Sequence, residues 1–180
     1  MFHTNRMIPL APWVAALGLA PEARIDTEAG PVRAEDLVPG QCILTRDNGA
    51  VPLVDLRIGL GAPAERRHFP VLITRGAMGF GLPRADLRIG AQQKVLFQNI
   101  RVPLMFGVDA VLVRGKSLAA SHEGVHVDNA PVPASFVQLV FATHQIIHAE
   151  GLPVESTAPD GMGQAPYPTL RSWELRAAVA

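Results

Sequence analysis

Cysteine is almost absent from this chain, which has one, Cys42, among 180 residues. A single thiol cannot build a disulfide framework or a multi-cysteine metal site within the chain. The chain also lacks an uninterrupted apolar run long enough to span a bilayer. Its sixteen glycines and sixteen prolines are spread along its length, and this spacing disfavours long helices. We therefore expect a fold of short strands joined by turns, with no membrane span.

An excess of charge of either sign is also absent, because sixteen Lys and Arg residues balance sixteen Asp and Glu residues. A chain without a positive excess or a basic cluster cannot hold nucleic acid by releasing counterions from the phosphate backbone. Zero net charge does not oppose contact between copies, so homo-oligomerisation stays open. Hydrophobic residues make up 48% of the chain, which excludes a disordered protein.

The N-terminus begins with an apolar stretch, Met7–Ala20, behind a single basic residue, Arg6. Pro9 and Pro12 interrupt this stretch, and no small-residue cleavage site follows it, so it does not fit an export signal. We expect an uncleaved arm with a short helix over Val14–Leu19. A cytoplasmic location is favoured, with secretion as the alternative.

Short segments with β-branched and alternating apolar residues recur every eight to twelve residues and predict an all-β domain. Asp47-Asn48-Gly49 lies between two of them and predicts a hairpin, because Asn and Gly tolerate positive φ. The expected strands are Arg24–Thr27, Gln41–Thr45, Val51–Ile58, Val71–Thr74, Asp86–Ile89, Lys94–Phe97, Val108–Val113, Gly124–Val127, Phe136–Phe141, Gln145–Ala149 and Val154–Ser156.

Only the N-terminal arm and Leu170–Val179 are expected to be helical, since Leu170, Trp173 and Ala177 share one helical face. The Gly- and Pro-rich stretch Gly161–Pro168 is typical of a linker. We expect three parts: an arm over 1–17, a β domain over 18–158, and a linker with a C-terminal helix over 159–180.

Several short phrases follow one another along the chain. They are Arg24–Thr27, Gly30–Gly40, Ile43–Gly49, Gly76–Gly79, Leu82–Leu87, Phe106-Gly107, His144–Gly151 and Glu155-Ser156. In this order they resemble a bacterial Hint (Hedgehog/intein) domain, from about Gly18 to Ser156. The resemblance implies an all-β, horseshoe-like fold of long twisted hairpins, in agreement with the expected strands.

The resemblance also implies where self-cleavage chemistry would be found. In active relatives the first residue of the domain, Cys or Ser, attacks the preceding carbonyl, and a nearby His protonates the departing amide nitrogen. The nucleophile divides the barrier through a covalent intermediate. Here the first position falls on Gly18, and the His position of a later block, Gly90–Lys94, falls on Gln93. Glycine has no attacking group, and an amide cannot donate a proton near neutral pH.

Two further positions also lack the polar residues that the resemblance implies for active relatives. Gln138 and Ala142 stand where relatives commonly carry His and Asp, and only His144 remains. We therefore interpret Gly18, Gln93, Gln138, Ala142 and His144 as vestigial positions. The sequence predicts a non-catalytic module that binds a protein or peptide partner or has a structural role. The alternative is an active self-cleaving or splicing domain whose nucleophile is relocated or mutated.

The remaining reactive side chains show no catalytic or metal-binding pattern. Cys42 is expected inside a strand, and Ser117, Ser121 and Ser135 have no visible base. The pairs His122/His126 and His144/His148 fall in β-type sequence, where a four-residue spacing separates side chains by roughly 13 Å. We predict no metal and no cofactor.

Two further stretches carry a structural interpretation. Glu150 and Glu155 flank Gly151-Leu152-Pro153 in what looks like a structural turn, with a catalytic acid as the alternative. Gly76–Gly81 lacks the strand-to-helix context of a phosphate loop.

Overall fold

The computed structural model describes residues 17–61, 69–129, 134–158 and 165–180. Strands dominate this part of the chain, and the all-β expectation is confirmed. The strands are β1 (Arg24–Thr27), β2 (Gly30–Arg33), β3 (Cys42–Thr45), β4 (Gly49–Pro52), β5 (Asp55–Gly61), β6 (Val71–Ile73), β7 (Leu87–Ile89), β8 (Lys94–Phe97), β9 (Val111–Arg114), β10 (Val125–Val127), β11 (Ala134–Val140), β12 (Ile146–Ala149) and β13 (Leu152–Glu155). The helices are η2 (Ala34–Asp36), α1 (Arg101–Phe106), α2 (Gly115–Ala119) and α3 (Ser172–Val179).

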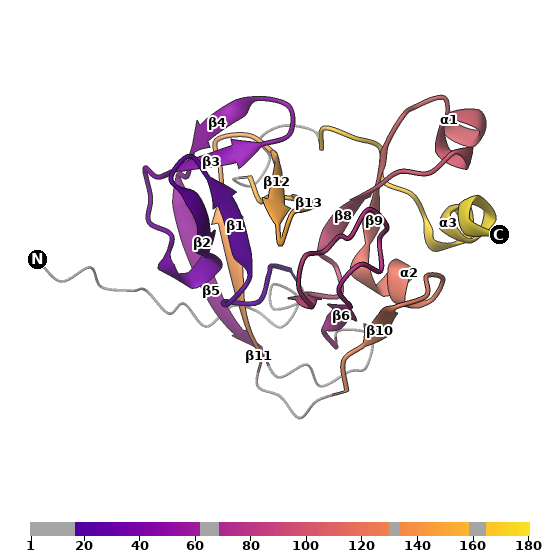
Figure 1. Ribbon diagram of the computed structural model, residues 1–180, viewed down its shortest axis with the longest axis horizontal. Helices are drawn as coiled ribbons and strands as arrows, with labels where there is room; N and C mark the ends of the chain where they lie inside the picture. The colour runs from indigo at the N-terminus through magenta and orange to yellow at the C-terminus, as the bar shows by residue number, and fades with distance from the viewer. Residues whose placement is uncertain (1–16, 62–68, 130–133, 159–164) are drawn as a thin grey trace, which may run out of the picture.

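The largest sheet has eight strands and extends from β2 at the left of Figure 1 to β8 and β9 at the centre right. Its order is β2-β1-β3-β12-β13-β8-β9, with β4 paired to β3. A three-stranded ladder, β10-β6-β7, and a two-stranded ladder, β11-β5, complete the described strands. Leu19 joins these two ladders, because it bridges Ile89 on one side and Val137 on the other.

Two hairpins show how the sequence sets the turns. The hairpin predicted at Asp47-Asn48-Gly49 is confirmed: it joins β3 to β4, and Gly49 has φ of 65°. The turn between β12 and β13 consists of Glu150 and Gly151, whose φ values are 49° and 76°. Positive φ at both central residues is the pattern of the type I′ turn, which suits the twist of paired strands.

The single strand expected over Val51–Ile58 is wrong, because the structure divides it into β4 and β5. The backbone changes partners at the break: Leu53 exchanges hydrogen bonds with residues 40 and 41, whereas Val54 donates to the Val140 carbonyl. The chain therefore leaves one sheet and enters another at Leu53, which is buried.

Two helices, α1 and α2, were not predicted from the sequence. Asn99 precedes α1 and accepts hydrogen bonds from the Arg101 and Val102 amides. Pro103 is tolerated in the first turn of this helix, and Gly107 ends it with φ of 68°. Each helix has at most six residues, too few for an apolar period to be recognised.

The C-terminal helix is confirmed as α3, but it begins at Ser172 rather than Leu170. Residues 168–170 are extended along β9 instead, with Leu112 exchanging hydrogen bonds with Pro168 and Leu170. At the other end, the expected helix over Val14–Leu19 lies largely outside the described residues, and Leu19 itself forms extended bridges.

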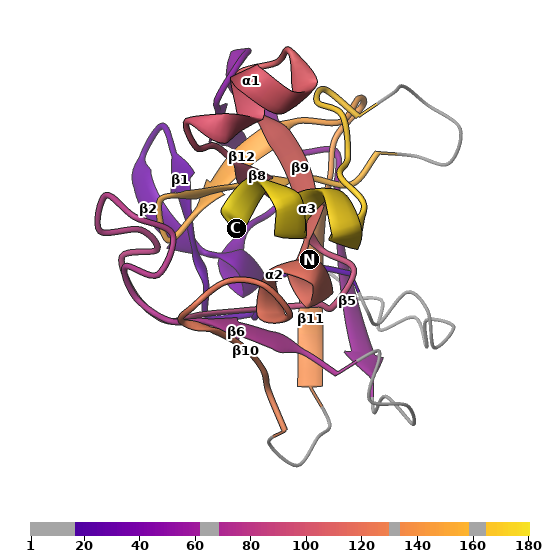
Figure 2. The ribbon, with the colours of Figure 1, turned by 90° about the vertical axis from the view of Figure 1, so that its right-hand side faces the viewer.

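The three α-helices gather at the end of the molecule where the C-terminus lies, with α3 between α1 and α2 (Figure 2). One apolar cluster fills the interior. It draws residues from the eight-stranded sheet, from both smaller ladders and from α3, and its fully buried members include Ile25, Ile73, Val137 and Leu175. In the described part of the chain, no helix combines the length and apolarity that crossing a membrane needs.

Candidate functional site

The predicted first position of the domain, Gly18, lies in a short extended segment between β7 and β11. Leu19 and Val137 exchange two backbone hydrogen bonds of 2.8 and 2.9 Å. On the other side, the Gly18 carbonyl accepts from Gly90, and Ala20 donates to the Arg88 carbonyl, both at 2.9 Å. The segment is therefore fixed on both edges, and Gly18 is buried.

This pairing gives Gly18 a backbone conformation that suits only glycine. Its φ is 114°, in the region that L-residues rarely adopt. A Cβ built on Gly18 would lie 2.7 Å from the Val137 carbonyl oxygen and 3.1 Å from the Phe136 Cβ. The glycine is thus required by the close approach of β11 as well as by φ.

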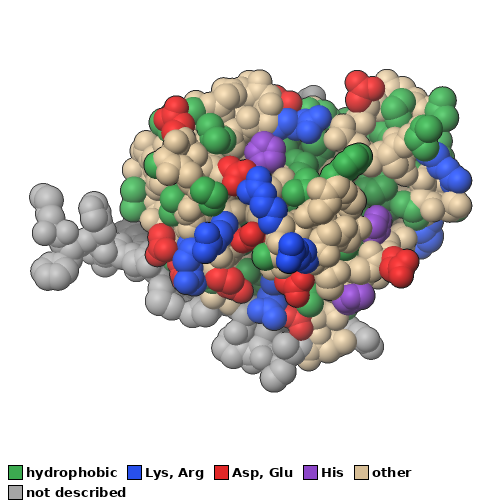
Figure 3. Space-filling view, viewed as in Figure 1, with side chains coloured by type: hydrophobic (Ala, Val, Ile, Leu, Met, Phe, Trp, Pro, Cys, Tyr) green, Lys and Arg blue, Asp and Glu red, His purple; other side chains and the backbone are tan. Residues whose placement is uncertain are grey.

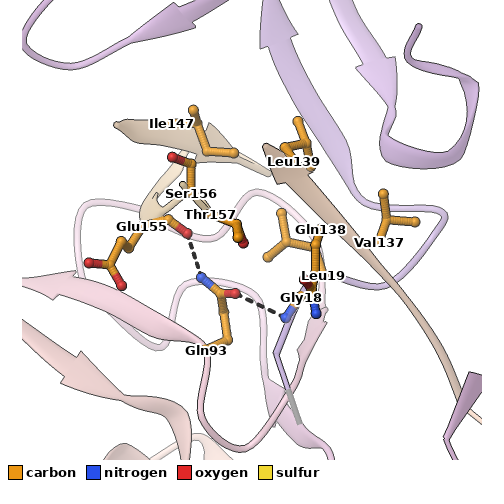
Figure 4. Close-up of a pocket in the computed structure, with 10 residues that line it drawn as sticks. All are labelled: Gly18, Leu19, Gln93, Val137, Gln138, Leu139, Ile147, Glu155, Ser156 and Thr157. Carbon is orange, nitrogen blue, oxygen red and sulfur yellow. Dashed lines mark hydrogen bonds between the residues drawn. The ribbon is translucent and has the colours of Figure 1, made fainter. Parts of the chain in front are cut away.

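Gln93 lies in the turn before β8 and connects Gly18 to the opposite strand (Figure 4). The Gly18 amide donates to its Oε1 at 3.0 Å, and its Nε2 donates to the Glu155 carbonyl at 2.7 Å. Nε2 also lies 3.2 Å from the Lys94 carbonyl. Gln93 is 6% exposed, so these bonds are made away from water.

The partners decide which way the Gln93 amide faces. A backbone N–H can only donate, so the atom facing Gly18 must be the oxygen. The two carbonyls can only accept, so the atom facing them must be the NH₂ group. Gln93 therefore presents an acceptor, and no proton donor, to the nitrogen of Gly18.

The space enclosed by these residues is very small. The cavity measures about 10 Å³, and about 10–15 Å³ is needed to hold a single water molecule. It is no larger than a single water molecule needs. Its lining residues are Gly18, Leu19, Gln93, Val137, Gln138, Leu139, Ile147, Glu155, Ser156 and Thr157.

The structure brings three of the five predicted site residues into one cavity. Gly18, Gln93 and Gln138 line it, and the Gln138 Nε2 lies 3.4 Å from the Leu17 carbonyl. His144 lies beside it, with Nδ1 3.2 Å from the Ser156 carbonyl. Ala142 is exposed and is not part of the cavity lining.

A polar cluster next to the cavity, made of Lys94, His144 and Glu155, was not predicted as a unit. The Lys94 Nζ lies 3.0 and 3.2 Å from the two Glu155 carboxylate oxygens. The His144 Nδ1 lies 3.9 Å from the Glu155 Oε1, which is the oxygen 3.2 Å from Lys94. The Glu155 side chain is 9% exposed, so the Lys94 charge compensates a largely buried carboxylate. The neighbouring residues Glu155-Ser156, noted above in the resemblance, were the signal for this part of the site.

The remaining candidates lie apart from this cavity. Cys42 is half-buried on β3, and Ser117 shares a hydrogen bond of 2.8 Å with Ser172 between α2 and α3. Ser121 and Ser135 are absent from the cavity lining. Glu150 accepts from the Arg24 amide at 2.8 Å and so supports the β12–β13 turn.

The histidines show no shared ligand geometry. His122 packs its ring edge-on against Phe97, while His126 is exposed on β10. Among the described residues, no three His, Cys, Asp or Glu side chains are grouped closely enough to hold a metal ion. The remaining two of the six histidines, His3 and His68, lie outside the described residues.

The surface carries charges of both signs. On the face shown in Figure 3, Lys and Arg side chains are interspersed with Asp and Glu. Pairs such as Arg88–Asp128 at 2.5 Å and Arg84–Asp26 at 3.2 Å account for part of this mixture. No single-sign field lies on that face to attract a phosphate backbone.

Comparison with known proteins assigns a family to this arrangement. A family model described as a Hint domain matches residues 17–161. Among solved structures, that of the MchDnaB-1 intein covers 76% of this chain and 98% of its own, with 16% identity and a TM-score of 0.44. That of the gp41-1 intein covers 76% and 96%, with 11% identity and a TM-score of 0.46. No curated protein sequence matches the chain.

Proposed function

Because the chain belongs to the Hint domain family, we propose that it is a non-catalytic Hint module that serves in protein–protein or structural interaction. Members of the family usually process their own chain. Here the position of the attacking residue is Gly18, and the position of the proton-donating His is Gln93. The observation that carries the proposal is the hydrogen-bonded bridge from Gly18 through Gln93 to Glu155.

The first reason is the missing nucleophile. Conversion of the Leu17–Gly18 peptide bond to an ester or thioester needs a hydroxyl or thiol on residue 18. Gly18 offers neither. Its φ and the nearby Val137 carbonyl also exclude a side chain unless the segment moves.

The second reason is the direction of the hydrogen bond at the junction. An amide nitrogen leaves only when it gains a proton as its bond to carbon breaks, and a positioned acid typically contributes about 10²–10⁴-fold to the rate. The Gln93 Oε1 accepts from the Gly18 nitrogen and has no proton to give. Gln93 therefore stabilises the uncleaved peptide rather than the departing amine.

Self-cleavage by a relocated nucleophile is the second candidate, because two hydroxyl residues, Ser156 and Thr157, line the cavity. The Ser156 Oγ accepts from the Gln145 amide at 2.9 Å. The nearest imidazole, His144, contacts the Ser156 carbonyl and not its hydroxyl. A base is thus not positioned on Ser156, and the non-catalytic function is favoured.

Mass spectrometry of the freshly purified chain tests the proposal. We expect the intact 19.3 kDa species after storage and after addition of dithiothreitol. A fragment beginning at residue 18 or 19 would contradict it. In that case Ser156→Ala and Thr157→Val would identify the relocated nucleophile, with Ser135→Ala as a matched control, since Ser135 lies on β11 outside the cavity.

A further inference from the structure

The three α-helices form one side of the molecule, which faces the viewer in Figure 2. Helix α3 lies between α1 and α2 and contacts both. Each helix packs on the interior through at least one apolar residue: Val102 of α1, Leu118 of α2 and Leu175 of α3 belong to the apolar core. The opposite sides of the three helices therefore face solvent together.

The solvent side of α3 carries an aromatic and a cationic residue. Arg176 and Ala177 lie three and four residues after Trp173, so the three share one helical face. All three are exposed, and Trp173 is 59% exposed. The face that the sequence predicts for Trp173 and Ala177 is thus turned to solvent, whereas Leu175 and Ala178 are buried.

The solvent side of α1 has a similar composition. Leu104 and Met105 lie three and four residues after Arg101 and share its helical face. Leu104 is 82% exposed and Met105 is 46% exposed. Apolar side chains are visible over α1 at the upper right of Figure 3, and Lys and Arg side chains lie below them at the right-hand edge.

Each of the three helices presents one cation to solvent. Arg101 of α1, Lys116 of α2 and Arg176 of α3 are exposed. None of the three forms an ion pair within the part of the chain that the structure describes. Cations on the sheets are more often paired, as Arg88 of β7 is with Asp128.

Acidic residues do not offset these cations on the helices themselves. The one acid in α1, α2 and α3 is Glu174, which is half-buried and accepts from the Arg171 amide at 2.6 Å. Asp109 and Glu123 are exposed but lie in the adjoining loops. The solvent side of the helices therefore has a positive excess, in a chain whose total charge is zero. We call this surface the helical face; it consists of Arg101, Leu104, Met105, Lys116, Trp173 and Arg176.

The composition of the helical face suits contact with a lipid bilayer. Trp is enriched at the boundary between lipid and water. Arg and Lys reach headgroups with their charged ends while their aliphatic stems stay among apolar neighbours. Buried apolar area and attraction to anionic lipid together determine how strongly a protein binds at this boundary.

Two features favour a bilayer over a protein partner. The three cations are on three different helices, so a protein would need acids at three separate places, whereas an anionic leaflet attracts cations over its whole surface. Leu104 projects into water with most of its side chain exposed. A rigid partner needs a matching hollow for such a side chain, but lipid acyl chains rearrange around it.

From these observations we propose that the helical face binds the surface of a membrane that contains anionic lipid, and lies on the bilayer without spanning it. The apolar members of the helical face enter the boundary between headgroups and acyl chains, and its three cations approach the lipid headgroups. This inference goes beyond the proposed function, and no residue of the helical face lines the cavity at Gly18.

Co-sedimentation of the full 180-residue chain with lipid vesicles tests the proposal. We expect binding to vesicles of phosphatidylcholine with phosphatidylserine and none to phosphatidylcholine alone, and the binding should weaken as salt screens the charges. Arg176→Glu should weaken it at least about fivefold, the contribution of one cation near an anionic surface. Arg24→Glu, at an exposed position on β1, is the matched control and should bind as the original chain does.

The apolar contribution is measured separately. Leu104→Gln retains a good helix former and should weaken binding about tenfold, because it removes the burial of a leucine side chain in lipid. Val38→Gln, at a 58% exposed position outside the helical face, is its control. In Trp13→Phe, Trp173 is the sole tryptophan, and its emission should shift to shorter wavelength when phosphatidylserine vesicles are added.

Four results would overturn the proposal. The first is no binding to phosphatidylserine vesicles, including the case in which the chain binds polyglutamate instead, since the occupant is then an acidic protein. The second is that Leu104→Gln and Arg176→Glu bind as tightly as the original chain, because another segment then makes the contact. The third is unchanged Trp173 emission. The fourth is self-association that Leu104→Gln abolishes, since the occupant is then a second copy.

Discussion

Gly18 owes its backbone conformation to the strand beside it. The two hydrogen bonds between Leu19 and Val137 draw the segment onto β11, so that the Val137 carbonyl occupies the space of a side chain at residue 18. The resemblance described in the sequence analysis implies that active relatives carry the reacting residue at this position. Here it is a structural glycine, and Gln93 uses both ends of its amide to keep it in place.

Substitution of Gly18 by Ala should therefore destabilise the protein. A non-glycine residue at φ of 114° costs about 1–3 kcal/mol, and the contact with Val137 adds to this. Urea unfolding followed by circular dichroism measures the loss. Gly30→Ala is a suitable control, since Gly30 also has positive φ but its Cβ would meet no atom within 4 Å. Equal losses in both variants would show that close packing on β11 is unimportant.

Gln93→Leu should lower the free energy of unfolding by about 2–5 kcal/mol, because it leaves a buried donor and a buried acceptor without partners. The affected groups are the Gly18 amide and the Glu155 carbonyl. The measurement is again urea unfolding. An unchanged midpoint would mean that water replaces the amide in the cavity.

Gln93→Glu offers a pH-dependent counterpart to this change. The introduced carboxyl group would face two carbonyl oxygens and be buried, so its pKa in the folded protein should rise above the ordinary value. Protonated, it can donate to the Glu155 carbonyl, and the deficit relative to the original chain should be smallest near about pH 4. As pH rises through the raised pKa the group ionises, and the deficit should grow toward neutral pH. A deficit independent of pH would contradict the assigned amide orientation.

The sequence predicted part of this site and missed the rest for a physical reason. The resemblance placed Gly18, Gln93 and Gln138 in one site, and the structure brings them together. It also included Ala142, which is exposed. The contacts that hold Gln93 are made by main-chain carbonyls, which every residue has, so no side-chain pattern could reveal them.

At the scale of elements, strands were predictable where β-branched residues alternate between two turns. The β3–β4 hairpin and β6, β7 and β8 follow the expected ranges closely. The expected Val51–Ile58 strand failed because Leu53 is buried while the chain passes between sheets, and this gives a continuous apolar pattern across a break. The helices α1 and α2 were missed because each is shorter than two turns.

Asn99 shows that a short helix here depends on one side chain. Its Oδ1 accepts from two amides at the start of α1, and its Nδ2 donates to the Ala178 carbonyl of α3 at 2.9 Å. Asn99→Ala should cost about 1–2 kcal/mol, the usual range for a lost helix cap. Asn99→Asp retains the acceptor and loses the donor, so its loss in urea unfolding should be smaller. If Asn99→Ala and Asn99→Asp lower the free energy of unfolding equally, the important contact is the hydrogen bond to α3 and not the helix cap.

At the scale of the whole molecule, Leu19 ties two ladders into one sheet, and it is 2% exposed. We propose that residues 1–16 can be removed without loss of the fold, whereas removal of residues 1–19 cannot. Loss of a buried leucine costs about 2–5 kcal/mol, to which the broken backbone bonds add. Thermal unfolding of the two truncated chains beside the full chain measures the difference. An equal loss of thermal stability in the two truncated chains would mean that residues before Leu17 also stabilise the fold.

The extended stretch that runs beside β9 just before α3 has a consequence for solubility. An uncovered outer strand presents a row of free amides and carbonyls on which another chain can form a ladder, which is a common route to aggregation. Here the Leu112 backbone is already bonded to Pro168 and Leu170. Proteolytic loss of the C-terminal tail would therefore expose an adhesive edge and promote fibril-like stacking, in addition to removing a helix.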